Sequence, residues 1–388
     1  MRCSLTNKQY YNLNDKRVVR LFWLLIDALY LDRYKTDAVI GTVIIPKNIY
    51  PYNQQTQYKS QSHKHTSYKS ILNQPIPVNL FTYYFTAYAI DQAKDNVPNA
   101  MSLSEFCKRT DIGLKLVTPN VFNKYYVANP ISRALTNVRL TDYPWNYNLW
   151  LMAYYMAGYH RPEPTRFTIF WLLLKMTLIG TNNRVFDPCA GWGDRLLASI
   201  GTKQVSEYIG MDINKSLIPA YKHIRKAFGT SVKSTLIIRD SSIPIRGRLS
   251  NTLGTFDAVI TSPPFFNGEL YYAAYAPWST FDEWARFFRD MLRNARTVLK
   301  PSGIAIIVIN DPMIISTRSF NIAGKVNISK PIDAIILGTR IKVDIITRNG
   351  NTYYQVSGHI GYAYEWFTLR QHVKFDIKGN DAWIFDIK

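Results

Sequence analysis

The sequence has few groups that could bind a metal or form a structural disulfide. Its 388 residues include only three cysteines and six histidines, with no CxxC pair and no zinc-ligand spacing. The cysteines are Cys3, Cys107 and Cys189. We therefore expect free thiols in a reducing compartment and no metal site.

Long hydrophobic runs are missing as well. The two longest, Leu21–Leu31 and Phe167–Gly180, are too short to span a bilayer, and they contain Asp27 and Lys175. The first seven residues are polar and show no secretory signal. These features predict buried helices, no membrane association and an intracellular protein, in the cytoplasm or nucleus. The Asn-, Tyr-, Ile- and Lys-rich composition is typical of an AT-rich genome, and for a viral chain the location would be the host cell or the virion.

Acidic residues are scarce relative to basic ones. There are 27 Asp and Glu against 47 Lys and Arg, which gives a net charge of +20. Residues 1–150 contain 18 basic and 9 acidic residues, and residues 151–388 contain 29 and 18. This balance indicates a polyanionic partner, most often a nucleic acid, although a merely basic soluble protein is the alternative. An excess of basic residues in both halves of the chain favours a positively charged cleft between them over a basic terminal arm.

From about residue 160, expected strands and helices alternate regularly. This pattern predicts an α/β fold with a parallel, doubly wound sheet. Thr280 and Glu283 predict a capping box at the start of the last helix. The expected strands are 184–186, 208–211, 234–238, 258–260 and 304–309, and the expected helices are 164–179, 194–201, 216–228 and 281–298. Hairpin strands are expected at 341–347 and 352–356, and a closing strand at 383–387.

One turn is unusually rich in hydrogen-bond acceptors. The apolar run that ends at Ile260 is followed by Thr261-Ser262-Pro263-Pro264-Phe265. Prolines fix φ and donate no N–H, so we expect their carbonyls to stay free as acceptors. Acceptors beside a flat ring suit the exocyclic NH2 of a nucleobase. The alternative is a proline turn that ends a strand and has no chemistry.

Three further strand ends carry groups that suit a ligand. Asp187 is followed by a Gly191-Trp192-Gly193 turn that opens a helix, and glycines let a ligand approach the backbone closely. Asp212 ends the next strand, about 20 residues on, where a carboxylate can bind ribose hydroxyls or simply cap a helix. Asp240 ends the third strand, where it can accept from an adenine amino group or simply shape a turn.

Four such turns at four successive strand ends are more specific than any one of them. Here the chain resembles the S-adenosylmethionine-dependent amino-methyltransferases that act on nucleic-acid bases. These enzymes have an Asp-x-x-x-Gly-x-Gly type of turn for the cofactor and an Asp/Asn/Ser-Pro-Pro-Tyr/Phe/Trp motif for the base. The resemblance covers roughly residues 160–315 and is strongest at 185–195 and 257–265.

The resemblance implies a Rossmann-like methyltransferase sheet with S-adenosyl-L-methionine as cofactor. Asp187, Gly191 and Gly193 would cradle the methionine part, with Cys189 in the same turn. Asp212 would bind the ribose. Two further contacts complete the implied cofactor site: Asp240 to the adenine, and Thr165, which lies where the family has an extra cofactor-contacting segment.

The resemblance also implies how the base is held. Ser262 and the Pro263 carbonyl would accept hydrogen bonds from the target NH2, Pro264 would stiffen the turn, and Phe265 would stack on a flipped base. Ser replaces the commoner Asp or Asn, and Phe replaces Tyr. In this family Ser-Pro-Pro favours cytosine N4, while adenine N6 stays open. Carbon-5 methylation is not expected, because the enzymes that perform it use a Pro-Cys pair that the 261–265 motif lacks, and Cys189 lies in the cofactor turn.

These implications give a predicted activity and a predicted domain division. We expect methyl transfer to an exocyclic amino group of DNA, with RNA as the next polymer. Methylation of RNA or of a protein amide is one alternative, and a non-catalytic nucleic-acid-binding or structural protein is another. Residues 151–388 are the expected methyltransferase domain. By elimination, the mainly helical region 1–150 is expected to grip the nucleic acid, because few residues follow Ile309.

Overall fold

The computed structural model describes most of the chain after residue 166 and short segments before it. The described residues are 19–20, 22–23, 26, 41–45, 79–95, 100–106, 154, 159, 162, 164–165, 167–228, 231–266, 269–270, 278–316, 329–348, 350–375 and 381–388. Cys3 and Cys107 lie outside them. No helix in these ranges has the length and hydropathy needed to cross a membrane.

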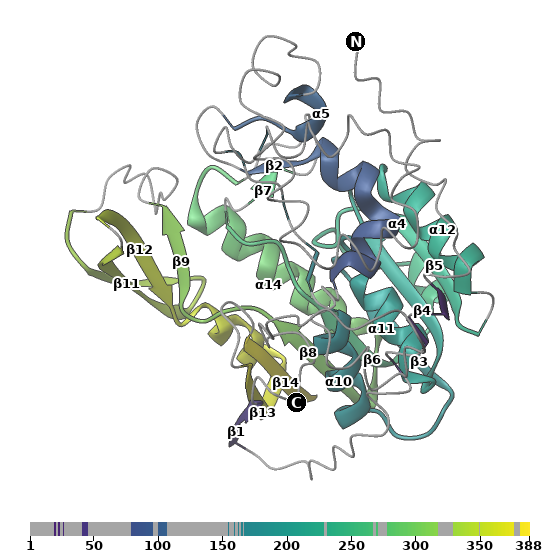
Figure 1. The fold of residues 1–388 in the computed structure, drawn as a ribbon. Helices are drawn as coiled ribbons and strands as arrows, with labels where there is room; N and C mark the ends of the chain where they lie inside the picture. Colours follow the sequence, from purple (N-terminus) through teal and green to yellow (C-terminus); the bar gives the residue numbers. More distant parts are fainter. Residues whose placement is uncertain are drawn as a thin grey trace.

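An eight-stranded, mostly parallel sheet forms the centre of the protein (Figure 1). Its strand order is β1-β13-β14-β8-β6-β3-β4-β5, and only β14 runs antiparallel to its neighbours. The strands are β1 (Gly41–Ile45), β3 (Asn183–Asp187), β4 (Val205–Asp212), β5 (Lys233–Ile238), β6 (Phe256–Thr261), β8 (Leu299–Val308), β13 (Phe367–Phe375) and β14 (Asp381–Ile387). The chain order reverses between β3 and β6. In open α/β sheets, ligands bind outside the carboxyl ends of the strands at such a point.

Helices cover both faces of this sheet, as the doubly wound prediction requires. Successive side chains of a strand point to opposite faces, so Val185 belongs to one hydrophobic core and Phe186 to the other. The first core contains side chains of α4 (Asn79–Gln92), α10 (Phe167–Thr177), α11 (Asp194–Thr202) and α12 (Leu217–Phe228). The second contains side chains of α13 (Arg248–Leu253), α14 (Phe281–Val298) and the 3-10 helix η3 (His359–Glu365). The predicted α/β class is confirmed.

Helix α14 begins and ends where the sequence predicts. The Thr280 side chain accepts from the backbone N–H of Glu283 at 3.2 Å, and the Glu283 carboxylate accepts from the backbone N–H of Thr280 at 3.3 Å. This reciprocal pair is the predicted capping box. It gives the helix a defined first turn beside the Ser-Pro-Pro-Phe segment.

A second sheet, of four antiparallel strands, stands apart from the central one (Figure 1). Its order is β10-β11-β12-β9, and it lies between β8 and β13 in the sequence. The strands are β9 (Met313–Ser316), β10 (Ile332–Ile336), β11 (Thr339–Arg348) and β12 (Asn351–Ser357). The predicted hairpin at 341–356 is confirmed as β11 and β12. We expected residues 1–150 to supply the residues outside the central sheet, but this second sheet supplies more of them. Strand β10 joins β11 through a two-residue turn at Leu337-Gly338, and β9 pairs with the more distant β12.

The described residues before position 150 pack against the central sheet domain. Phe22 and Phe85 lie with their ring centroids 4.6 and 5.5 Å from that of Phe228 in α12. Strand β1 pairs with β13, and β2 (Lys94–Asp95) pairs with β7 (Glu269–Leu270), just beyond the Ser-Pro-Pro-Phe turn. The short helix α5 (Leu103–Phe106) adds Phe106 to the same core. The division at residue 150 stays a prediction, but the two regions share one hydrophobic core.

We therefore expect Phe85→Ala to destabilise the whole protein. Phe85 is fully buried, and removal of a buried Phe side chain typically costs about 3–5 kcal/mol. Urea unfolding followed by tryptophan fluorescence and circular dichroism should show one transition at a lower midpoint. Ile179→Ala, at a residue that is 91% exposed, is the control and should change little. If the protein instead unfolds in two transitions and the variant lowers only the midpoint of the one that belongs to the N-terminal region, the core is not shared.

Candidate active site

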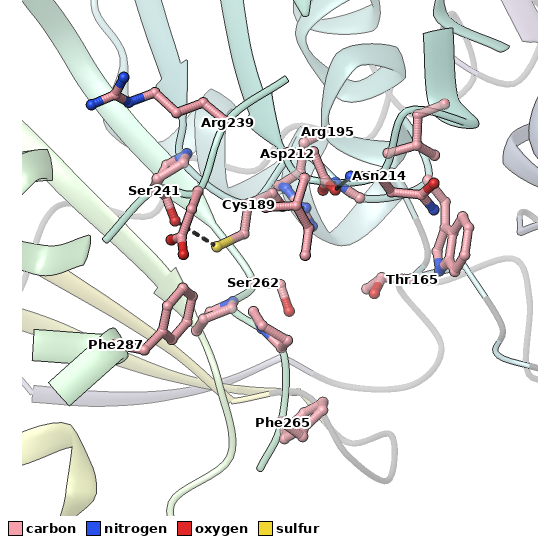
Figure 2. Close-up of a pocket in the computed structure, with 18 of the residues that line it drawn as sticks. Thr165, Cys189, Arg195, Asp212, Asn214, Arg239, Ser241, Ser262, Phe265 and Phe287 are labelled. Carbon is pink, nitrogen blue, oxygen red and sulfur yellow. Dashed lines mark hydrogen bonds between the residues drawn. The ribbon is translucent and has the colours of Figure 1, made fainter. Parts of the chain in front are cut away.

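A pocket lies where the carboxyl ends of β3, β4, β5 and β6 meet (Figure 2). Nine of the eleven residues predicted for the site line it: Thr165, Cys189, Gly191, Asp212, Asp240, Ser262, Pro263, Pro264 and Phe265. The structure does not bring Asp187 or Gly193 to the pocket wall. In Figure 2, Ser262 lies between Asp212 and Cys189 on one side and Phe265 on the other.

Asp187 supports the glycine turn from behind. It is fully buried, and its Oδ2 accepts from Arg195 Nε at 2.6 Å and from the Tyr208 hydroxyl at 2.7 Å. Its Oδ1 accepts from the backbone N–H of Cys189 at 3.2 Å. Burial raises the pKa of Asp187, while Arg195 and Tyr208 act in the opposite direction. The carboxylate thus joins the backbone of the turn to α11 and β4, and it shapes the turn.

The two glycines have backbone conformations that other residues rarely adopt. Gly191 has φ +54° and Gly193 has φ +98°. A Cβ at Gly193 would lie 2.9 Å from Ile224 Cδ1, so α12 packs directly against the turn. The Tyr221 hydroxyl of the same helix donates to the Ala190 carbonyl at 2.9 Å. Gly193 therefore allows close packing, and Gly191 faces the pocket.

Two carboxylates share one buried guanidinium at this turn. Arg195 Nη1 also lies 3.2 Å from Asp194 Oδ2, and Arg195 Nη2 donates to the Cys189 carbonyl. Burial disfavours the charge of Arg195, but Asp187 and Asp194 raise its pKa well above the ordinary value. Burial raises the pKa of Asp194 to about 6. The guanidinium is thus a fixed positive charge that lines the pocket.

Asp212 joins the second strand end to the glycine turn. Its Oδ2 accepts from the backbone N–H of Gly191, and its Oδ1 from that of Asn214, each at 2.8 Å. Burial raises the pKa of Asp212, and the two backbone donors oppose that rise. Each oxygen keeps a lone pair for a ligand. The buried Asn214 lines the same wall, and its Nδ2 has no acceptor among the described residues.

The loop after β5 is held by a residue of α14. Asp240 Oδ1 accepts from the backbone N–H of Ser242 at 2.8 Å and from its hydroxyl at 2.7 Å. Asn294 Nδ2 donates to the carbonyls of Ser241 and Ile243 at 2.7 and 2.9 Å. Asp240 therefore shapes a turn, as the alternative interpretation proposed, while it also lines the pocket.

The Ser-Pro-Pro-Phe turn differs from its prediction in one respect. Trp284 Nε1, in α14, donates to the Pro264 carbonyl at 2.9 Å. The expectation that both proline carbonyls stay free is therefore wrong for Pro264. The donor comes from a helix 20 residues further on, which the motif itself does not reveal. Ser262 and Pro263 still line the pocket.

Several lining residues were not singled out from the sequence. Trp278 and Phe287 lie with ring centroids 4.8 Å apart on the pocket wall. Ile213 and Leu217 line the wall near Asp212, and Arg239 lines it near Asp240. Ile213 and Arg239 adjoin a predicted site residue in the sequence. Trp278 and Phe287 come from another part of the chain, and only the fold brings them here.

A family comparison addresses the part of the chain that contains the Ser-Pro-Pro-Phe turn. Residues 256–379 match the model of the N6/N4 DNA methylase family. The match covers β6, the Ser-Pro-Pro-Phe turn, α14, β8, the antiparallel sheet and β13, and it is less than half of the chain. The glycine turn and Asp212 precede this DNA methylase segment. No curated protein matches the sequence.

Solved structures similar to the chain are distant from it. The glycopeptide N-methyltransferase MtfA complexed with sinefungin is 12% identical over 57% of this chain and 94% of its own, with a TM-score of 0.35. TrmN from Thermus thermophilus is 13% identical over 58% of this chain and 49% of its own, with a TM-score of 0.30. This chain therefore spans about half the length of TrmN. The CcbJ methyltransferase from Streptomyces caelestis is 10% identical over 56% and 88%, with a TM-score of 0.34.

The buried ion pair gives a test of the turn. Arg195→Leu should destabilise the protein by about 3–5 kcal/mol, because Asp187 would be left buried without its cation. The double variant Asp187→Asn/Arg195→Leu leaves only Asp194 without its cation and should be more stable than Arg195→Leu alone, in which Asp187 and Asp194 both lose it. Urea denaturation measures both. If the double variant loses as much free energy of unfolding as Asp187→Asn and Arg195→Leu lose separately, added together, the two residues are not coupled.

The thiol in the turn should be unreactive although it lines the pocket. Burial raises the pKa of Cys189 to about 12, so about one thiol in ten thousand is ionised at pH 8. We expect iodoacetamide to label Cys189 slowly in the native protein and readily in guanidinium chloride, as measured by peptide mass spectrometry. Rapid native labelling would contradict a thiol that stays neutral in the pocket wall.

Proposed function

We propose that the protein transfers a methyl group from S-adenosylmethionine to an exocyclic amino group of a base in DNA. The observation that carries the proposal is that the Ser-Pro-Pro-Phe turn and three ligand-type turns line one pocket. The DNA methylase match, which includes Ser262–Phe265, supports DNA as the polymer. The net charge of +20 supports a polyanionic partner.

The residues on the β3–β5 side of the pocket fit the cofactor. Asp212 presents carboxylate oxygens for the ribose hydroxyls, and the unused Nδ2 of Asn214 is a donor beside it. Ile213 supplies apolar surface for the adenine, and Asp240 an acceptor for its amino group. Gly191, with Cys189 and Thr165, leaves room for the methionine part. When bound, S-adenosylmethionine supplies an activated methyl group on a sulfonium sulfur.

The residues on the β6 side fit the target base. Ser262 Oγ and the Pro263 carbonyl accept the two hydrogens of an NH2 group, which directs the nitrogen lone pair toward the cofactor side. The same acceptors stabilise the positive charge that develops on the nitrogen. Phe265 stacks on the flipped base. In the direct displacement the nitrogen–carbon bond forms as the sulfur–carbon bond breaks, the electron pair stays on sulfur, and the methylated nitrogen loses one proton to solvent. This step needs alignment above all, and alignment lowers the barrier substantially.

Product analysis tests the proposal. The protein is incubated with isotopically labelled S-adenosylmethionine and, separately, with DNA, RNA and a mixture of unmodified proteins. We expect labelled N4-methylcytosine or N6-methyladenine from DNA after digestion to nucleosides. If the label appears only in RNA or only in a protein amide, that polymer is the substrate and DNA is not. No label in any of them, together with no cofactor binding by calorimetry, would overturn the methyltransferase proposal.

Variants of the turn separate binding from turnover. Ser262→Ala combined with Phe265→Ala should lower turnover by about 100-fold or more, because it removes an acceptor and the stacking surface. The cofactor dissociation constant should change by less than about 3-fold, since neither residue is assigned to the cofactor. The control Ser302→Ala, at an exposed residue at the start of β8, should change neither quantity. Unchanged turnover in the double variant would refute the assigned base pocket.

A further inference from the structure

One face of helix α14 contacts three of the four turns of the site: the Ser-Pro-Pro-Phe turn, the glycine turn and the loop after β5. Trp284, Phe287, Met291 and Asn294 follow each other at spacings of three, four and three residues, so they share one side of the helix. Trp284 binds the Ser-Pro-Pro-Phe turn, and Phe287 lines the pocket. Met291 Sδ lies 3.6 Å from Cys189 Sγ in the glycine turn, and Asn294 binds the loop after β5.

The orientation of Trp284 is fixed on both sides of its ring. The side chain is fully buried, and its ring stacks on Phe288 at 5.2 Å with an interplanar angle of 19°. The ring of His359 meets it edge-on at 5.7 Å. His359 itself is held in η3, where the Asp311 carboxylate accepts from the backbone N–H groups of Gly358 and Ile360. The indole N–H therefore points in one direction, toward Pro264.

This hydrogen bond changes what the catalytic turn offers to a substrate. The indole N–H fixes the direction of the Pro264 carbonyl, while Ser262 and Pro263 line the pocket, where the proposed function uses Ser262 Oγ and the Pro263 carbonyl as acceptors. Their number equals the number of hydrogens on an NH2 group. Without the indole donor the Pro264 carbonyl would not be held in one direction, and the turn could rotate. Trp284 thereby holds the turn in one orientation relative to the pocket.

On the cofactor side, Asn294 orients the loop that follows Asp240. It is 2% exposed, and its amide donates to two successive parts of the loop that follows Asp240. Ten residues of helix separate it from Trp284, a span of about 15 Å along a rigid axis. A single helix thus fixes the loop near the adenine and the turn near the amine relative to each other.

We propose that Trp284 and Asn294 are positioning residues at the two ends of one rigid helix. Trp284 aims the Ser-Pro-Pro-Phe turn at the target amine, and Asn294 sets the loop that receives the cofactor. The inference rests on the proposed methyl transfer. It predicts a division of labour, because each residue acts through a different turn.

The test compares Trp284→Phe with Asn294→Leu. Trp284→Phe keeps an aromatic ring and removes the N–H, and it should lower kcat about 10- to 100-fold with the cofactor Kd unchanged. Asn294→Leu should raise the cofactor Kd roughly 10-fold while kcat at saturating cofactor changes by less than about 3-fold. Calorimetry gives the Kd, and product nucleoside analysis gives kcat. Equal effects of both variants on both quantities would overturn the proposal and indicate a merely structural role.

Trp383→Phe is the matched control. Trp383 Nε1 also donates to a backbone carbonyl, that of Ile309, at 3.0 Å, and Trp383 does not line the pocket. It should lower thermal stability without changing kcat or the cofactor Kd. If Trp284→Phe does not fold, 3-benzothienylalanine at position 284 keeps the ring shape without the N–H and should show the same loss of kcat. If the wild type is active and either substitution at position 284 leaves kcat undiminished, the role of Trp284 is overturned and the methyl-transfer proposal stands. If the wild type itself is inactive, the methyl-transfer proposal is overturned as well.

Discussion

The site depends on the buried contact between the Asp187 carboxylate and the Arg195 guanidinium. Asp187 ends β3, and Arg195 lies in the first turn of α11, so the ion pair closes the glycine turn between them at 2.6 Å. Arg195 also holds the Cys189 carbonyl, and Asp187 holds the Cys189 N–H. With both backbone groups of Cys189 engaged, the N–H of Gly191 points to Asp212. Removal of Arg195 would leave Asp187 buried without a cation, a state that costs several kcal/mol, whereas removal of Asp187 would leave Arg195 paired with Asp194 alone.

The two sides of the pocket are built in different ways. The side formed by β3, β4 and β5 is mostly local, because each carboxylate binds backbone N–H groups within its own turn or in the neighbouring one. The side formed by β6 depends on α14, whose Trp284 fixes Pro264. Pro263 and Pro264 have no N–H to donate within the turn, and the indole of Trp284 supplies a donor from outside it. The same helix binds the loop after β5 through Asn294. The β3–β5 side of the pocket therefore also depends on a contact between residues that are far apart in the sequence.

The local features of this protein could be predicted from its sequence, and the long-range ones could not. Strand ends, the glycine turn and the capping box of Thr280 with Glu283 have signals within a few residues, and the structure contains them. The indole of Trp284 has no such signal, because it meets Pro264 through the packing of α14 on the sheet. For the same reason Phe287 was not singled out, and the Pro264 carbonyl was wrongly expected to stay free. The four-stranded sheet was recognised only as its β11–β12 hairpin, since β9 pairs with β12 across more than one intervening strand in the sequence.

Cys189 is the point where the ion pair and helix α14 meet. Its backbone belongs to the Asp187–Arg195 contact, and its sulfur lies 3.6 Å from Met291 Sδ and 3.7 Å from Ser241 Oγ. A side chain here must be small enough to leave room in the pocket and must stay neutral between the Asp187 and Asp212 carboxylates. A thiol meets both needs, because burial and those two negative charges keep it protonated, with its pKa raised to about 12. The sulfur is polarisable and packs well against Met291 without demanding a strong hydrogen bond. We therefore interpret Cys189 as a packing residue that lets α14 approach the glycine turn, rather than as a nucleophile.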